Sequence, residues 1–389
     1  MPKGTITPYI ELESVPFNFQ IPGTNEDTIF SVTAIGGGLI NDTYLVKNSL
    51  PFGEVGKTTD PAAQFILQRI NTNVFLNVRE LMINMHKVSL HLQSKSNDHG
   101  HCLSIIPTKD GRLFWERNVN KEEKEVWRML NYISGVSYPL ATNNNLLYEA
   151  GRAFGKFQYD LRDFSSSELY DTIPDFHNTQ KRLEDFRKAV KDDKFDRANA
   201  VKEEICYIES KSDLASFITD LMNEGLLPKR VTHNDTKLDN VLFDPMTNKA
   251  LCVVDYDTIM SGCMLFDFGD GIRSSNSNAE SSTDTSKVAF DIDAYQHFTK
   301  GFLEEVAPMI TGIERECLHM GAIVITFEQT IRFLTDFLLG DVYFKIDYSE
   351  QNKIRGRNQM ELLKGMLAKK DEMSLIIKNF NSASKVFTK

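Results

Sequence analysis

The sequence predicts an α+β protein with two lobes: a small N-terminal lobe built on an antiparallel β-sheet with one helix, and a larger, mainly α-helical C-terminal lobe. The chain has 389 residues, which is more than an ordinary single-core domain contains. Short β-rich apolar runs fill roughly the first 130 residues, and apolar residues follow a helical period from Leu146 onward. A single hairpin pattern interrupts the helical part. We therefore expect lobes of residues 1–133 and 134–389.

The elements of the N-terminal lobe follow from short apolar runs separated by glycines and polar loops, a pattern typical of an antiparallel sheet. Between two of these runs, Val78, Leu81, Met85 and Leu92 recur at helical spacing and predict the one helix. The predicted strands are residues 29–35, 39–46, 65–70, 103–106, 113–115 and 126–133. Residues 48–63 form a long loop without a recognisable motif.

In the C-terminal lobe, Leu147, Ala150, Phe154 and Leu161 mark one face of an amphipathic helix. The hairpin is predicted at residues 241–243 and 251–254, because a tight-turn sequence separates the two apolar runs.

Two further stretches of this lobe are conspicuous for their composition. Residues 181–197 alternate both signs of charge around apolar positions, which favours a solvated helix face over a binding site. Residues 274–286 are rich in serine and predict a mobile loop.

Composition argues against several classes of protein. Lys and Arg number 44 against 54 Asp and Glu, a net charge of -10, so there is no overall basic field for nucleic acid. No apolar run is long enough for a membrane helix, and the N-terminus lacks the pattern of a secretory signal. The five cysteines form no C-x-x-C pair, which argues against a zinc site or a disulfide framework. We expect a cytoplasmic monomer with reduced thiols.

The densest chemical signal is His233-Asn234-Asp235-Thr236-Lys237-Leu238-Asp239-Asn240, directly before the first arm of the hairpin. In phosphoryl transfer, an Asp at the position of Asp235 takes or orients the proton of the attacking hydroxyl, and an Asn at that of Asn240 holds magnesium. Lys237 can place a positive charge on the transferring phosphoryl group. In the alternative, structural reading, His233 is a buried histidine, Asp235 a turn residue and Asn240 a strand cap. The apolar flanks and the acidic residue described next favour the catalytic reading.

Asp255 is the second acidic centre, at the end of the second hairpin arm. Because a hairpin returns the chain to its start, we expect Asn240 and Asp255 to lie side by side as oxygen ligands of magnesium. Asp267-Phe268-Gly269 spells the magnesium-binding tripeptide of protein kinases, but it lies further downstream, behind residues 261–263 that resemble a turn. We therefore assign the metal to Asp255 and expect Asp267 to anchor the catalytic loop.

Three glycines, Gly36, Gly37 and Gly38, lie between two predicted strands, where backbone N–H groups could contact nucleotide phosphates. They do not fit the G-x-G-x-x-G form, so this interpretation depends on the downstream motif. An ordinary hairpin turn is the alternative.

These features resemble the aminoglycoside phosphotransferase and choline kinase superfamily, which has the bilobal protein-kinase-like fold. Within it, the chain resembles the N-acetylhexosamine 1-kinases. The segments that carry this resemblance are Ile40-Asn41, Thr43-Tyr44-Leu45-Val46, Ile66-Leu67-Gln68, Val231 to Leu238, Asp257 to Met260, Leu265 to Asp270 with Ile272-Arg273, Arg332-Phe333-Leu334 and Gly340 to Phe344.

The resemblance implies transfer of a phosphoryl group from ATP, with Mg²⁺, to the anomeric hydroxyl of N-acetylglucosamine or N-acetylgalactosamine. The N-terminal lobe would then bind the nucleotide, and the C-terminal lobe would carry the catalytic and substrate-binding residues. Asp235 would be the base, Lys237 would face the phosphates, and Asn240 with Asp255 would bind magnesium. Arg332, Tyr343 and Asn41 would contact the sugar; read alone, Arg332 could equally be a surface arginine.

Two positions need comment. Gln68 stands where a protein kinase has its strand lysine, and it matches the sugar kinases, so we expect it at the nucleotide. Leu39 stands where the resembled kinases lead us to expect a histidine, which leaves the sugar preference open. The competing readings are a kinase of another small alcohol, such as choline, homoserine or an aminoglycoside, and a nucleotide-sensing pseudokinase.

Overall fold

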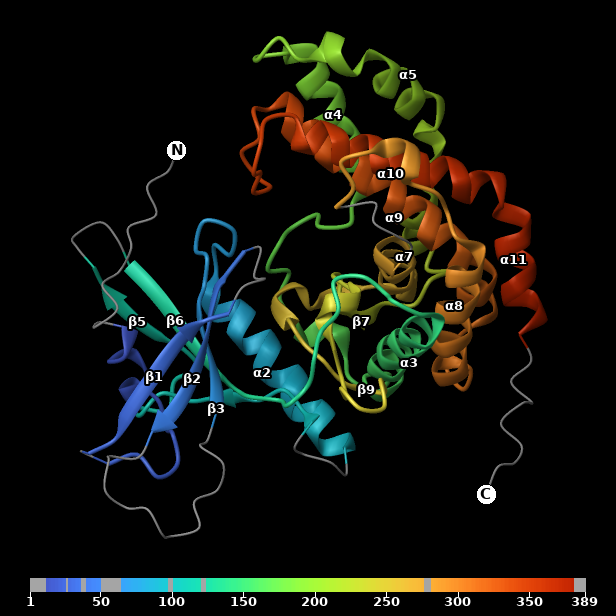
Figure 1. The fold of residues 1–389 in the computed structure, drawn as a ribbon. Coiled ribbons are helices and arrows are strands. Elements are labelled where there is room, and N and C mark those ends of the chain that lie inside the picture. The colour runs from blue at the N-terminus through green and yellow to red at the C-terminus, as the bar shows by residue number, and fades with distance from the viewer. Residues whose placement is uncertain are drawn as a thin grey trace. The chain divides into compact units, whose positions relative to one another are not determined.

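The computed structural model describes residues 12–25, 27–35, 40–49, 64–96, 101–119, 124–275 and 281–380. The chain divides into two compact units, Met1–Ser134 and Gly135–Lys389 (Figure 1). The predicted α+β class is confirmed, since the first unit is built on an antiparallel sheet and the second is mainly helical. No helix among the described residues is long and apolar enough to cross a membrane.

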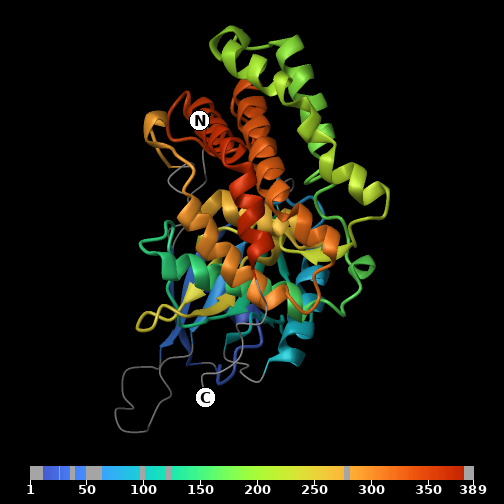
Figure 2. The same ribbon diagram turned by 90° about the vertical axis from the view of Figure 1, so that its right-hand side faces the viewer.

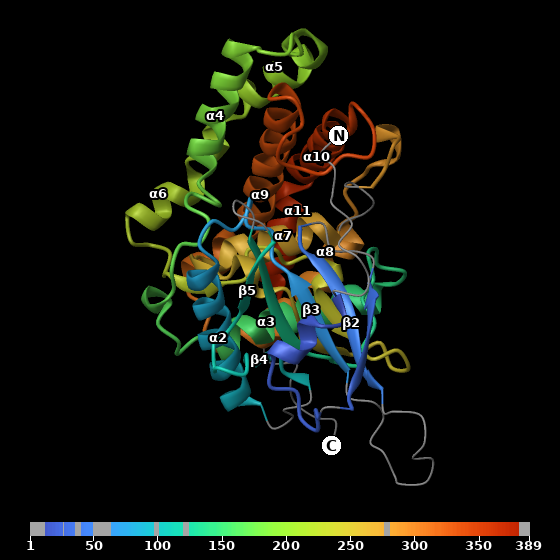
Figure 3. The same ribbon diagram turned by 90° about the vertical axis from the view of Figure 1, so that its left-hand side faces the viewer.

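The N-terminal unit is an antiparallel sheet in the order β1-β2-β3-β6-β4, with β5 pairing to β6. Its strands are β1 (Ile29–Ala34), β2 (Asp42–Ser49), β3 (Gln64–Arg69), β4 (Ile105–Ile106), β5 (Trp115–Asn118) and β6 (Lys124–Asn131). The helix α2 (Val78–Lys95) starts at Asn77, whose side chain accepts a hydrogen bond from the Glu80 N–H. Figure 3 shows α2 beside the sheet that contains β2 and β3.

The two faces of this sheet have different partners. Phe30, Val46, Leu67 and Trp127 belong to a core cluster with the N-terminal segment that includes Val15 and Phe19. Side chains alternate along a strand, so Gln68 and Arg128, the neighbours of Leu67 and Trp127, lie on the opposite face. On that face the Arg128 guanidinium contacts the α2 methionines Met82 and Met85.

The C-terminal unit is organised around the long, almost entirely buried helix α9 (Gly312–Leu338). A capping box begins it: the Thr311 hydroxyl accepts from the Glu314 N–H, and the Glu314 carboxylate accepts from the Thr311 N–H. The other helices are α3 (Asn144–Asp160), α4 (Thr179–Asp192), α5 (Lys202–Ser210), α6 (Phe217–Asn223), α7 (Met264–Ser275), α8 (Ile292–Val306), α10 (Gln351–Ala368) and α11 (Lys370–Asn379). Of these, α4, α7 and α10 pack on α9, and Figure 2 shows the green α4 beside the orange-red α9.

Two antiparallel strand pairs complete this unit: β7 (Arg230–Thr232) with β10 (Met260–Gly262), and β8 (Val241–Phe243) with β9 (Ala250–Val253). The predicted hairpin is confirmed as β8 and β9. The predicted turn at residues 261–263 is wrong, because Ser261 and Gly262 pair with Val231 and Arg230. Met260-Ser261-Gly262 contains one large apolar residue, so β10 has no apolar run by which it could be recognised from the sequence.

The loop predicted at residues 274–286 is also partly wrong. Ser274 and Ser275 end α7, and Thr285–Lys287 form a short 3-10 helix. The described end of this segment is attached to α10, since Asn358 donates to the Ser282 carbonyl at 2.7 Å and accepts from the Thr285 hydroxyl at 2.8 Å. Residues 276–280 lie outside the described part of the chain.

Candidate active site

The β8–β9 hairpin positions the two residues assigned to magnesium. Asp244 closes its turn by accepting hydrogen bonds from the N–H groups of Met246 and Thr247 at 2.9 and 2.7 Å. At the other end, the Val254 N–H donates to the Asn240 carbonyl at 2.9 Å. Asn240, just before β8, and Asp255, shortly after β9, therefore lie at the same open end of the hairpin. Asp255 is exposed, with a left-handed backbone at φ 65°.

The loop at residues 233–236, which we call the catalytic loop, is attached to α7 by Asp267. This carboxylate accepts hydrogen bonds from the backbone N–H groups of His233 at 2.9 Å and Asn234 at 2.8 Å. Asn234 has a left-handed backbone at φ 64°, which turns successive N–H groups toward one acceptor. Gln158 of α3 donates to the same carboxylate at 2.5 Å. The predicted anchoring role of Asp267 is confirmed by these contacts.

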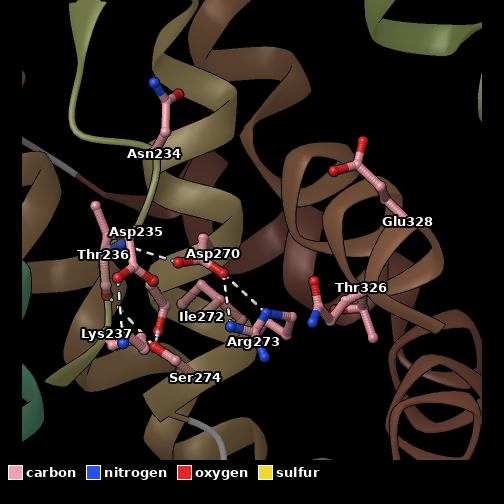
Figure 4. Close-up of polar contacts among 12 residues, drawn as sticks. Asn234, Asp235, Thr236, Lys237, Asp270, Ile272, Arg273, Ser274, Thr326 and Glu328 are labelled. Atoms are coloured by element: carbon pink, nitrogen blue, oxygen red, sulfur yellow. Dashed lines mark hydrogen bonds and ion pairs between the residues drawn. The ribbon is translucent and has the colours of Figure 1, made fainter. Parts of the chain in front are cut away.

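A second carboxylate of α7 holds the next turn of the loop. Asp270 accepts a hydrogen bond from the Thr236 N–H at 2.8 Å and forms an ion pair with Arg273 at 2.7 Å (Figure 4). The Thr236 hydroxyl donates to the Asp267 carbonyl at 2.6 Å. Two carboxylates one helical turn apart thus fix the backbone on both sides of Asp235. Reasoning from the sequence assigned no role to Asp270.

His233 is fully buried and serves the structure of the loop. One ring nitrogen, Nε2, lies 2.9 Å from the Val254 carbonyl, and the Thr258 hydroxyl donates to the His233 carbonyl at 2.7 Å. The structural interpretation of this histidine is therefore correct, and it is compatible with a chemical role for Asp235. The ring ties the catalytic loop to the residue just before Asp255.

Asp235 is partly exposed and lies beside a cation. Lys237 Nζ is 3.1 Å from Asp235 Oδ2, and the Asn240 amide nitrogen donates to the same oxygen at 3.0 Å (Figure 4 shows the Asp235–Lys237 pair). Burial alone would raise the pKa of Asp235, but the charges of Lys237 and His233 and these hydrogen bonds hold the pKa below its usual value. The carboxylate is consequently ionised at neutral pH, the form in which it can accept a proton.

The donor set at the hairpin end fits a magnesium ion. The side-chain amide nitrogen of Asn240 donates to Asp235, so the side-chain amide oxygen is turned away from that carboxylate. Together with the exposed Asp255 carboxylate this offers two oxygen ligands, the type that Mg²⁺ prefers when phosphates and waters complete its shell. The described residues contain no group of three or more His, Cys, Asp or Glu suited to a metal. A two-ligand site of this kind requires none.

In the N-terminal unit, Gln68 is part of a polar pair that the sequence did not predict. Its amide oxygen accepts from Arg128 Nε at 2.8 Å, and its amide nitrogen donates to the Thr43 hydroxyl at 3.1 Å. Arg128 is directly opposite Gln68 in the sheet register. A guanidinium thus lies next to the position where a protein kinase has its strand lysine. The available signal was an arginine in the middle of the apolar run from Val126 to Leu130.

The predicted sugar contacts fall in both units. Arg332 and Tyr343 come together, with the Arg332 Cζ 5.8 Å from the Tyr343 ring centroid. Asn41 is buried and accepts a hydrogen bond from the Asn71 N–H at 2.9 Å. Its contact with a substrate stays a prediction, as do the roles of the other site residues. Gly36, Gly37, Gly38 and Leu39, and residues 50–63 of the long loop, lie outside the described part of the chain.

This arrangement of a sheet unit, a helical unit and a catalytic loop before a hairpin is the kinase-like fold. The chain is similar to a microcompartment-associated aminopropanol kinase, with a TM-score of 0.58 at 12% identity, covering 95% of this chain and 99% of that one. It is also similar to a choline kinase from Cryptosporidium parvum Iowa II, with a TM-score of 0.53 at 16% identity over 95% and 99% of the two chains. An amicoumacin kinase in complex with AMP-PNP, Ca²⁺ and Ami matches with a TM-score of 0.52 at 10% identity over 96% of each chain.

The family follows from the sequence itself. The model of the APH phosphotransferase enzyme family matches residues 31–298, which is more than half of the chain. The protein belongs to this family.

Proposed function

We propose that the protein is a kinase that transfers a phosphoryl group from ATP to the anomeric hydroxyl of an N-acetylhexosamine, giving the sugar 1-phosphate. The observation that carries the reaction type is the catalytic loop: an ionised Asp235 beside Lys237, on a backbone held by Asp267 and Asp270. The pairing of Arg332 with Tyr343 and the resemblance to N-acetylhexosamine 1-kinases support the acceptor. The proposal has the enzyme act as a cytoplasmic monomer.

In the proposed reaction, Asp235 accepts the proton of the acceptor hydroxyl. Both neighbours of its carboxylate, Lys237 and Asn240, contact Oδ2, so Oδ1 is the oxygen assigned to the hydroxyl. As that proton moves to Oδ1, the hydroxyl oxygen forms a bond to the γ-phosphorus of ATP and the bond to the ADP oxygen breaks. The Lys237 ammonium lowers the free energy of the negative charge on the transferring group.

Asn240 and Asp255 would hold the magnesium ion through the oxygens described above. When bound, Mg²⁺ neutralises phosphate charge and orients the nucleotide. In the N-terminal unit, Gln68 would contact the nucleotide, and the buried Arg128 would orient its amide group. The amicoumacin kinase structure contains AMP-PNP and Ca²⁺, which supports a nucleotide and a divalent cation as the molecules bound here.

A kinase of a small amino alcohol is the second candidate, because the similar structures include an aminopropanol kinase and a choline kinase. Their identity to this chain is low, so they support the fold more than the acceptor. The pseudokinase reading is disfavoured, since Asp235, Lys237, Asn240 and Asp255 are all present.

One experiment tests the proposal directly. N-acetylglucosamine, N-acetylgalactosamine, choline, homoserine and an aminoglycoside are each supplied with ATP and Mg²⁺, ADP release is measured, and the product is identified by phosphorus NMR. We expect release with the N-acetyl sugars and a 1-phosphate product. A sugar 6-phosphate, or turnover of choline alone, would contradict the proposal.

A further inference from the structure

A cluster of charged side chains lies where the segment before α4 meets α9. Its members are His177, Arg182 at the start of α4, and Glu328 and Arg332 of α9; we call it the α4–α9 cluster. Both guanidiniums lie at Phe176: Arg182 Nη2 donates to the Phe176 carbonyl at 3.1 Å, and the Arg332 Cζ is 5.1 Å from the Phe176 ring centroid. Residues from two distant stretches of the chain thus bring two positive charges together.

The cluster contains more positive than negative charge. Glu328 is buried, and its two oxygens contact His177 Nδ1 at 2.8 Å and the Thr179 hydroxyl at 2.7 Å. Burial alone would raise the pKa of Glu328, but His177, Arg332 and these hydrogen bonds keep the pKa below its usual value. One carboxylate charge therefore stands against two guanidiniums. Asp185, which lies on α4 three residues after Arg182, forms an ion pair with Lys181 at 2.6 Å.

Two nitrogens of the cluster lack a hydrogen-bond partner among the described residues. They are His177 Nε2 and Arg182 Nε, and both atoms are buried. The His177 side chain is 6% exposed. Because the partner of Nδ1 is an ionised carboxylate, we assign the ring proton to Nδ1, which leaves Nε2 to accept a hydrogen bond when the ring is neutral. Buried polar atoms without partners are costly and point to a ligand or water that satisfies them.

The α4–α9 cluster contacts the elements that position the catalytic loop. The Phe266 ring lies 4.8 Å from the His177 ring, and Phe266 precedes the loop anchor Asp267 on α7. The Ile173 N–H contacts the Met260 sulfur at 3.4 Å, on the strand β10 that pairs with β7. Since β7 runs directly into His233, the cluster and the loop are positioned by one framework. Figure 4 shows Glu328 on the helix beside α7, which carries Asp270 and Arg273.

We propose that Arg182 and His177 join Arg332 in binding the non-reacting end of the acceptor, and that this end presents oxygen groups rather than an ammonium group. The inference rests on the proposed phosphotransfer and adds two specificity-determining residues to it. A sugar hydroxyl can donate to His177 Nε2 and accept from a guanidinium, and an acyl oxygen can accept from Arg182 Nε. An ammonium group would meet two like charges while the oxygens of Glu328 are already engaged.

Two aromatic rings beside Arg332 complete the proposed acceptor site. Tyr343 and Phe344 have their ring centroids 5.8 and 5.7 Å from the Arg332 Cζ, and Tyr343 is half exposed. Ring faces of this kind can pack against the apolar face of a sugar while the guanidinium contacts its oxygens. Neutral or anionic polyols are the ligand class that fits best.

The test compares two arginines of the same helix. Arg182→Gln should raise the acceptor KM roughly 10- to 100-fold, the loss typical of a hydrogen bond to a charged group, while the ATP KM and the melting temperature stay close to the parent values. Arg187→Gln is the control, because Arg187 is exposed and paired with Glu209 at 2.6 Å. Arg182→Lys keeps the charge and loses the Nε donor, so its acceptor KM should lie between those of Arg182→Gln and Arg187→Gln. A folded Arg182→Gln with an unchanged acceptor KM overturns the inference.

A second measurement uses the unmodified protein, so it tests the inference even if Arg182→Gln does not fold. Calorimetric titration in the presence of AMP-PNP and Mg²⁺ compares N-acetylglucosamine with glucosamine, choline and ethanolamine. We expect the three ammonium compounds to bind at least about tenfold more weakly. Equal or tighter binding of any of them overturns the inference.

The outcomes separate the inference from the proposed function. A 1-phosphate product together with an unchanged acceptor KM in Arg182→Gln contradicts the inference alone. Turnover of a different polyol, with its KM raised in Arg182→Gln, contradicts the N-acetylhexosamine assignment and supports the inference. Turnover of an amino alcohol that is insensitive to Arg182→Gln contradicts both.

Discussion

At the scale of single residues, Asp235 is the position whose chemistry can be isolated most cleanly. Asp235→Asn preserves the size of the side chain and removes the proton acceptor. We expect kcat to fall by roughly two to four orders of magnitude, as for loss of a general base. Nucleotide affinity should change little, because the proposed role of this carboxylate is toward the acceptor. Steady-state kinetics and titration with AMP-PNP measure both; a variant that keeps more than about a tenth of the parent rate excludes Asp235 as the base.

Which residues could be found from the sequence depends on how local their chemistry is. Asp235, Lys237 and Asn240 are within six positions of one another, so their pattern is visible in one stretch of chain. Arg182 lies in a charged helix that reads as a solvated face, and only the packing of α4 on α9 brings it to Arg332. Burial, followed by the charge of Arg332, lowers the pKa of Arg182, a dependence on tertiary neighbours that no local pattern reveals.

Among the elements, α7 and the β8–β9 hairpin position different parts of the candidate site: α7 holds the catalytic loop, and the hairpin holds Asn240 and Asp255. Asp267→Asn on α7 would turn an amide N–H toward a backbone donor at His233 or Asn234, costing about 1–3 kcal/mol of stability for the unmet group. We expect a lower melting temperature and a lower kcat. Thermal denaturation without ligands is the measurement.

Asp255→Ala at the hairpin end is the matched comparison, because Asp255 is exposed. It should leave the free energy of unfolding of the ligand-free protein within about 0.5 kcal/mol of the parent value. Its effect should appear in magnesium-dependent nucleotide affinity. If Asp267→Asn weakened magnesium dependence more than Asp255→Ala did, the assignment of the metal would have to move to α7.

A second prediction at this scale concerns the close contact of α3 with α8. A Cβ added at Gly301 would lie 2.1 Å from the Tyr148 carbonyl oxygen, whereas one at Gly312, the first residue of α9, would meet nothing within 4 Å. Gly301→Ala should therefore destabilise the protein by about 1–3 kcal/mol, the range for overpacking. Gly312→Ala serves as the control and should change stability little. Equal chemical denaturation midpoints for the two variants would contradict the close packing of these helices.

Elements were predictable where the apolar pattern was long or the turn chemistry explicit. The hairpin was recognisable because Asp244 to Lys249 is a turn sequence between two apolar runs. The strand β10 was not, since Met260-Ser261-Gly262 is neither an apolar run nor next to an explicit turn sequence. Ser274 and Ser275 end α7 although serine is a weak helix former, because the helix continues by packing against α8 and α9.

At the scale of the whole molecule, the change of apolar period was sufficient to predict a sheet unit followed by a helical unit. The sequence also indicated that a lone hairpin in the helical part needs an explanation, and the hydrogen bonds around Asn240 and Val254 provide one. The acceptor could not be predicted in the same way. Its proposed contacts come from α4 and, about 150 residues later in the sequence, from α9 and the segment after it, and these stretches have no motif in common.

Nucleotide binding should be visible as a change in the stability of the entire chain. A ligand that binds only the folded state adds about 2.7 kcal/mol when its concentration is 100 times its Kd. We expect AMP-PNP to raise the melting temperature strongly with Mg²⁺ and weakly with EDTA, because in the proposed site the ion links Asn240 and Asp255 to the nucleotide phosphates. Asp235→Asn should retain the full magnesium-dependent shift, and Asp255→Ala should lose most of it. The same shift in EDTA as in Mg²⁺, or a full shift in Asp255→Ala, would show that the nucleotide binds without the proposed metal site.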